Sequence, residues 1–178
     1  MLKNTEDSYG FVTRFFHWVI AIAIISLITV GFTMSSMDPS PEKAELYGMH
    51  KASGVMVFML IILRLLWKFS NKAVNPPKDL PNILKLAAKS GHFLLYVFMF
   101  SMPISGILMT CFSGYDVSVF GLFVIPAAEK DPAIAGIFYQ IHTIGIWAFM
   151  AVIILHVGGA LYHHFIRRDN VLIRMIKG

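Results

Sequence analysis

Four of the seven histidines in this chain have positions and spacings that could bind metal. His142 and His156 are fourteen residues apart on one uncharged stretch, and on an α-helix this spacing returns to nearly the same face ~21 Å further along the axis. His17 and His50 lie near the ends of two other stretches. Because imidazole is costly to bury in hydrocarbon, these histidines imply polar partners or a metal that takes a ring nitrogen. Two haem irons, each bound by two imidazoles, would use all four.

The composition places these histidines in a membrane protein. Of 178 residues, 57% are hydrophobic and 14% are charged, and the mean hydropathy is +0.69, outside the range of soluble domains. A helix needs ~20 apolar residues to cross ~30 Å of hydrocarbon. We therefore expect an all-α integral membrane protein with one domain over residues 1–178. Its four-transmembrane-helix bundle should use helices at about 15–35, 49–69, 90–112 and 134–166.

Other functional classes lack their sequence signals. Cys111 is the single cysteine, so a disulfide framework is excluded, and without C-x-x-C-H any haem is held by ligation and packing alone. The basic residues are scattered through loops and form no patch with interleaved aromatics, so no nucleic-acid partner is expected. The first apolar stretch ends without a small-x-small cleavage pattern, and we interpret it as a retained helix.

Charge predicts the orientation of the helices, because short cytoplasmic loops collect Lys and Arg. With four spans, most basic residues fall on one side: Lys3, Arg14, Lys68, Lys72, Lys78, Lys85, Lys89, Arg167, Arg168, Arg174 and Lys177. The other side holds three basic and six acidic residues: Lys43, Lys51, Lys130, Asp38, Glu42, Glu45, Asp116, Glu129 and Asp131. Both termini are therefore expected in the cytoplasm.

This topology sorts the four histidines into two levels. His50 and His142 fall toward the outer side, and His17 and His156 toward the inner side. Each level supplies two imidazoles from different helices, which is what six-coordinate haem iron needs above and below its ring. The alternative for any one histidine is a hydrogen bond to a neighbouring carbonyl or a place in a wet crevice.

Small residues and one arginine accompany the histidines. Gly54 follows His50 by four and Gly145 follows His142 by three, so a porphyrin face could approach there, although glycine is also common at plain helix contacts in membranes. Arg64 lies fourteen residues after His50, on the same face and at the inner level. It could pair with haem propionates or a quinone oxygen, or extend to the cytoplasmic interface.

Three further histidines lie near the inner level: His92 and the adjacent pair His163 and His164, whose side chains diverge by about 100° and cannot both face one metal. His92 opens the third helix at the inner side, so by depth alone it competes with His17 as the partner of His156. His164 is eight residues past His156 and shares roughly its face. A role in handling protons near an inner haem and a plain interfacial position both remain open for it.

Together these residues match a family. The segments that carry the likeness are Phe16, His17 and Trp18; Gly48 to Gly54; Arg64 with Leu65; Gly91 with His92; His156 followed by Leu161, Tyr162, His163 and His164; and Arg168 to Met175. Over nearly the whole chain this pattern resembles the bacterial cytochrome b561 family. It is also similar to the cytochrome b subunits of membrane formate dehydrogenases and nickel-iron hydrogenases, which share a four-helix, two-haem plan.

The resemblance implies a di-haem b-type cytochrome of the bacterial inner membrane. It implies that His50 and His142 ligate an outer haem b, that His17 and His156 ligate an inner one, and that His92 is not a ligand. Electrons would pass from a periplasmic one-electron donor to ubiquinone or another quinone at the cytoplasmic side, where His92, His164 and Arg64 are candidates for the quinone site. Superoxide is one candidate donor, and Lys51 beside His50 could attract such an anion.

Rival functions are also open. An outer partner protein would make the chain the membrane anchor and electron-transfer subunit of a dehydrogenase or hydrogenase complex. A haem-free proton-coupled transporter could place histidines and Arg64 along a substrate path. A divalent-metal carrier is less well matched, because the spans contain no carboxylate to complete a site.

Overall fold

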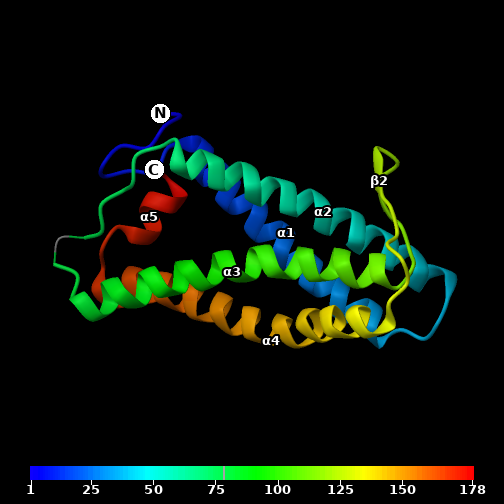
Figure 1. Ribbon diagram of the computed structural model, residues 1–178. Helices are drawn as coiled ribbons and strands as arrows, with labels where there is room; N and C mark the ends of the chain where they lie inside the picture. The colour runs from blue at the N-terminus through cyan, green and yellow to red at the C-terminus, as the bar shows by residue number, and fades with distance from the viewer. Residues whose placement is uncertain (78) are drawn as a thin grey trace. The chain divides into compact units, whose positions relative to one another are not determined.

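Four long helices dominate the structure, a computed structural model that describes residues 1–77 and 79–178, so that Lys78 lies outside the described residues. They are α1 (Phe11–Ser36), α2 (Pro41–Phe69), α3 (Asn82–Phe112) and α4 (Pro132–Tyr162), followed by the π-helix η1 (His163–Arg167) and by α5 (Val171–Ile176) (Figure 1). Each long helix, with η1 continuing the last, is long and apolar enough to cross a membrane. The expected all-α membrane architecture with four spanning helices is confirmed.

All four long helices begin before the predicted spans, at Phe11, Pro41, Asn82 and Pro132, and side chains cap the starts of α2 and α4. Ser40 Oγ accepts a hydrogen bond from the amide of Lys43, 3.2 Å away. Asp131 Oδ1 accepts the amides of Ala133 and Ile134 at 2.9 and 3.0 Å. In both cases proline occupies the first helical position, where its missing N–H is no loss. The cap at Ser40 therefore starts α2 eight residues before its predicted span, whereas Asp131 starts α4 two residues before its span.

A small antiparallel hairpin between α3 and α4 was not anticipated as strands. Strand β1 (Val117–Val119) pairs with β2 (Phe123–Ile125), with Val117 opposite Ile125 and Val119 opposite Phe123. Val117 and Val119 are buried against Val55 of α2 and Cys111 of α3, whereas Ser118 between them is exposed. The base of the hairpin is therefore part of the core beside these helices.

The contacts within the chain define two units, and every long helix contributes a segment to each. The first unit comprises Met1–Val19, Ile62–Phe98 and Ala148–Gly178, and the second comprises Ile20–Ile61 and Met99–Trp147. Each unit is thus a bundle of four helix segments. His17, His92 and His156 belong to the first unit, and His50 and His142 belong to the second.

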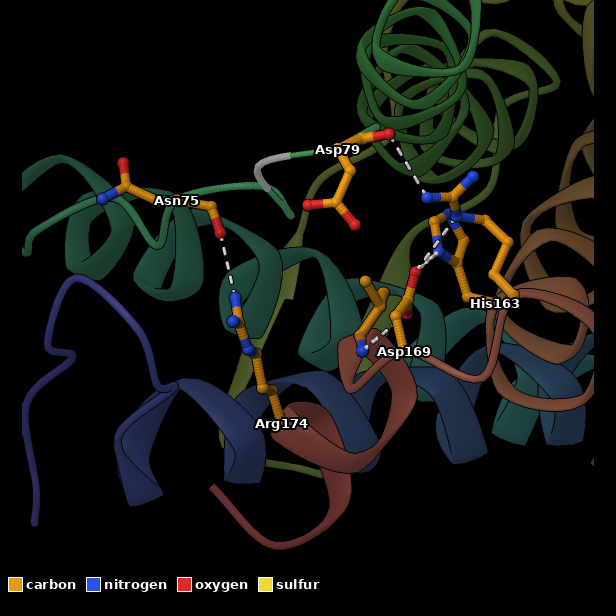
Figure 2. Close-up of polar contacts among 7 residues, drawn as sticks. Asn75, Asp79, His163, Asp169 and Arg174 are labelled. Carbon is orange, nitrogen blue, oxygen red and sulfur yellow. Dashed lines mark hydrogen bonds and ion pairs between the residues drawn. The ribbon is translucent and has the colours of Figure 1, made fainter. Parts of the chain in front are cut away.

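In the first unit the C-terminal segment is attached by polar contacts (Figure 2). Arg174 Nη1 donates to the carbonyl of Asn75 at 3.0 Å, and the carboxylate of Asp169 lies 2.6 Å from His163 Nδ1. Burial raises the pKa of Asp169, but hydrogen bonds from His163, the Val171 amide and Arg167 outweigh burial and hold that pKa below its ordinary value. The ionised carboxylate therefore fastens the chain where η1 ends.

Candidate functional site

In the second unit, α2 and α4 bring His50 and His142 together. Their ring centroids are 6.3 Å apart and the ring planes are inclined by 83°. An iron atom held between two imidazole nitrogens by bonds of ~2 Å separates the ring centroids by roughly 6 Å. The observed separation therefore fits two axial ligands of one haem iron.

Hydrogen bonds fix the tautomer of His142. Its Nδ1 lies 2.9 Å from the carbonyl oxygen of Met102 and 3.1 Å from the hydroxyl of buried Ser105, which itself donates to the Met102 carbonyl. A carbonyl can only accept, so Nδ1 carries the proton and the lone pair of Nε2 is free. Haem-binding and metal-binding histidines are commonly oriented in this way. Across the gap, Nδ1 of His50 is buried and has no hydrogen-bond partner among the described residues.

A cleft surrounds this pair of histidines. Gly54 lies in its wall, and a Cβ atom there would meet nothing within 4 Å, so the helix offers free space beside His50. Gly106 on α3 instead packs directly against the ring of His142. Lys51 also lines the cleft and is the cationic side chain nearest in sequence to His50. Of the two glycines noted in the sequence, Gly54 leaves an open helix face. A Cβ atom at Gly145 would instead lie 3.3 Å from the sulfur of Met102.

In the first unit three histidines meet. The ring centroids of His17 and His156 are 6.1 Å apart, and those of His92 and His156 are 5.5 Å apart. The separation between His17 and His156 is close to that in the second unit and fits a bridging iron. The ring of His92 lies slightly closer to His156 than the ring of His17 does, so both are neighbours of His156.

Arg64 contacts one of these histidines. Its Nη2 lies 3.3 Å from Nδ1 of His17, and because a guanidinium can only donate, Nδ1 must be the acceptor. Binding of iron through Nε2 would instead place the proton on Nδ1. Arg64 must then turn to another acceptor, and a haem propionate or a quinone oxygen is of the right kind.

Beside the same cluster lies a cavity of about 320 Å³. It is lined by Lys68, Lys89, His92, Phe93 and Tyr96. The ammonium of Lys68 sits 4.5 Å from the centre of the Tyr96 ring, a cation–π contact. His92 thus contacts His156 on one side and lines this cavity on the other. The ring of His164 packs against the ring of Phe165, and His164 is not among the residues that line the cavity.

Several of these residues were missed from the sequence. Lys89 and Tyr96 stand three residues before and four after His92, so helical spacing places them on its face and would have found them. Ser105, Gly106 and the carbonyl of Met102 carry no such signal, since their role depends on how α3 packs on His142.

Comparison with known proteins covers both histidine clusters. The family described as prokaryotic cytochrome b561 matches residues 8–178. The chain is 33% identical over 177 residues to cytochrome b561 homolog 2 of Escherichia coli (strain K12), covering 97% of this chain and 93% of that protein. It is 30% identical over 173 residues to cytochrome b561 homolog 1 of the same organism, with 91% and 93% covered. Identity to the probable superoxide oxidase CybB of Yersinia pestis is 28% over 167 residues, with 90% of each chain covered.

Proposed function

The chain belongs to the prokaryotic cytochrome b561 family, a family of b-type haem proteins, and we propose that it carries electrons through two haems from a periplasmic one-electron donor to a quinone at the cytoplasmic side of the bacterial inner membrane. The observation that carries this proposal is the pair of imidazole separations, 6.3 Å in the second unit and 6.1 Å in the first. Each matches the space that one iron between two ring nitrogens requires.

In this proposal His50 and His142 hold the outer haem, and His17 and His156 hold the inner one. Haem held by these histidines would supply a one-electron ferric–ferrous couple, and coordination by two imidazoles would favour electron transfer over oxygen binding. The protein's part is to hold those imidazoles in the binding tautomer, as the Met102 carbonyl does for His142. Two imidazoles are the number of protein ligands that six-coordinate haem iron requires.

Orientation follows from charge. The first unit contains both chain termini and the linker after α2, where the basic residues gather. Because Lys and Arg collect in cytoplasmic loops, we assign both chain termini and the linker after α2 to the cytoplasmic side.

The cavity beside His92 is the proposed quinone site. Reduction of a quinone consumes two electrons and two protons, so the site must supply both. His92 lies against His156 and faces the cavity, which suits it to deliver a proton, and the cationic Lys68 stabilises negative charge on a quinone oxygen. Arg64, once released from His17, serves the same purpose or holds a propionate. His164 is retained as a candidate for proton uptake from the cytoplasm.

For the outer donor we propose superoxide. Lys51 lines the cleft that contains His50 and His142, and a cationic side chain there attracts a small anion. The Yersinia relative is named as a probable superoxide oxidase, which supports this choice. Two superoxide ions each give up one electron and leave as oxygen, and together they reduce one quinone. A redox protein docked at the same cleft is the second candidate, as in a dehydrogenase or hydrogenase complex.

The test uses the purified protein in phospholipid vesicles loaded with ubiquinone. We expect two haems per chain, b-type bands in the reduced-minus-oxidised spectrum, and quinone reduction when superoxide is generated outside. If two haems are present but superoxide does not reduce them, the proposed donor is contradicted and a docked redox protein becomes the candidate donor. A haem-free preparation, made with adequate haem supply, would contradict the function as a whole.

A further inference from the structure

The turn of the β-hairpin holds an aromatic residue in an unfavourable backbone conformation. The amide of Leu122 donates to the carbonyl of Val119 at 2.9 Å, which closes a four-residue turn. Its two central residues, Phe120 and Gly121, both have positive φ, of 50° and 73°. This is the pattern of a type I′ turn, which favours Asn-Gly or Asp-Gly. Glycine suits its position, but a bulky side chain at positive φ is strained.

Packing within the chain does not explain this choice of residue. Phe120 is 58% exposed, and its neighbour Leu122 is 74% exposed. The opposite is true at the base of the same hairpin, where Val117 and Val119 are almost completely buried. The strain at Phe120 is therefore offset by something outside the chain.

The position of the hairpin identifies that partner. The hairpin leaves from the end of the membrane-spanning helix α3 and returns to it, since the amide of Ala128 donates to the carbonyl of Cys111 at 3.1 Å. Asp116 Oδ1 accepts the amide of Ala127 at 2.7 Å and so closes the base. The hairpin therefore starts at the level where the apolar span ends. At that level aromatic and aliphatic side chains are stable between lipid headgroups and acyl chains.

Charge argues against a protein partner at this point. From Val117 to Ala128 the sequence contains no charged residue, whereas docking sites for soluble redox proteins are steered by complementary charge. We propose that the hairpin tip, defined as Phe120, Gly121 and Leu122, inserts into the phospholipid interface and anchors the hairpin there.

The anchor bears on the candidate site. Val117 of the same hairpin lines the cleft of His50 and His142, so the hairpin is also a wall of that cleft. Inserting the tip into lipid holds this wall in place next to the membrane surface. The inference does not depend on which donor or acceptor the protein uses.

Spin labels on single introduced cysteines test the proposal in the full chain reconstituted in phosphatidylglycerol–phosphatidylethanolamine vesicles. The native Cys111 is buried and does not compete for the label. Phe120→Cys and Leu122→Cys report on the tip, and Glu129→Cys in the charged loop beyond the hairpin is the control. Collision rates with oxygen, which concentrates in lipid, are compared with those of a water-soluble nickel complex.

We expect oxygen collisions to dominate at both tip positions and nickel collisions to dominate at Glu129→Cys. Nickel collisions that dominate at the tip would show that it lies in water and would overturn the proposal. Low collision rates with both reagents would show that protein covers the tip, a second copy of the chain included, and would overturn it as well. Since two tip positions are labelled, failure of one variant to fold leaves the other as the test.

Discussion

Replacement of Gly106 by alanine should weaken the outer haem site without unfolding the protein. A Cβ atom at this position would lie 3.2 Å from Cε1 and 3.4 Å from Nδ1 of His142, close enough that the ring must move by a few tenths of an ångström. The ring of His142 is held by its 2.9 Å hydrogen bond to the carbonyl of Met102, which lies on α3 together with Gly106. Displacing it strains that bond, and disturbing such an orienting bond lowers metal affinity by ~10- to 100-fold.

The stability of the chain should change little. Alanine in place of glycine inside a helix contributes ~0.5–1 kcal/mol, and loss of one hydrogen bond costs ~0.5–1.5 kcal/mol, so the two effects nearly cancel. Titration of the haem-free protein with haem measures the affinity directly. Gly136→Ala is the matched control, because it lies on α4 with His142 and its Cβ would meet nothing within 4 Å. An unchanged outer haem affinity in Gly106→Ala would refute the proposed role of the His142 orientation.

Arg64→Ala should slow quinone reduction roughly tenfold or more, because a cationic hydrogen-bond donor beside the quinone is lost. Both haems should remain bound. Loss of the inner haem from Arg64→Ala would show that the role of Arg64 is structural instead. The C-terminal segment should respond to acid through Asp169, whose pKa is lowered in the folded protein. The ionised carboxylate therefore stabilises the attachment fully above the ordinary carboxyl pKa, and this stabilisation is lost as pH falls through the lowered folded value. Hydrogen exchange of residues 163–178 should show this loss. The amides of this segment should exchange faster in Asp169→Asn than in the wild-type protein already at neutral pH. Equal protection in the wild type and the variant would contradict the stabilising role of the Asp169 carboxylate.

The membrane helices could be predicted from the sequence because burial in lipid demands apolar residues over a fixed length. Their starts were less predictable, since α2, for example, begins with a polar turn capped by Ser40 that hydropathy ignores. The hairpin was missed for a related reason. Only three residues pair on each strand, and a short apolar stretch does not distinguish a strand from an interfacial segment.

The grouping of the histidines was predictable because helix periodicity and alternating direction place residues at the same depth. The structure brings His50 to His142 and His17 to His156, and their role as haem ligands stays a prediction. Depth did not distinguish His17 from His92, and in the structure the rings of both lie near the ring of His156. The hydrogen bond from His142 to Met102 was equally hidden, because it joins α4 to a backbone atom of α3.

The most direct test of the account is the absorbance of single histidine variants. If His50 and His142 hold one haem, His50→Ala and His142→Ala should each remove the same b-type chromophore, with the same midpoint potential, and leave the other haem in place. His17→Ala and His156→Ala should remove that other haem. Retention of both chromophores in His50→Ala or His142→Ala, or loss of different chromophores from these two variants, would contradict the claim that the two imidazoles share one iron.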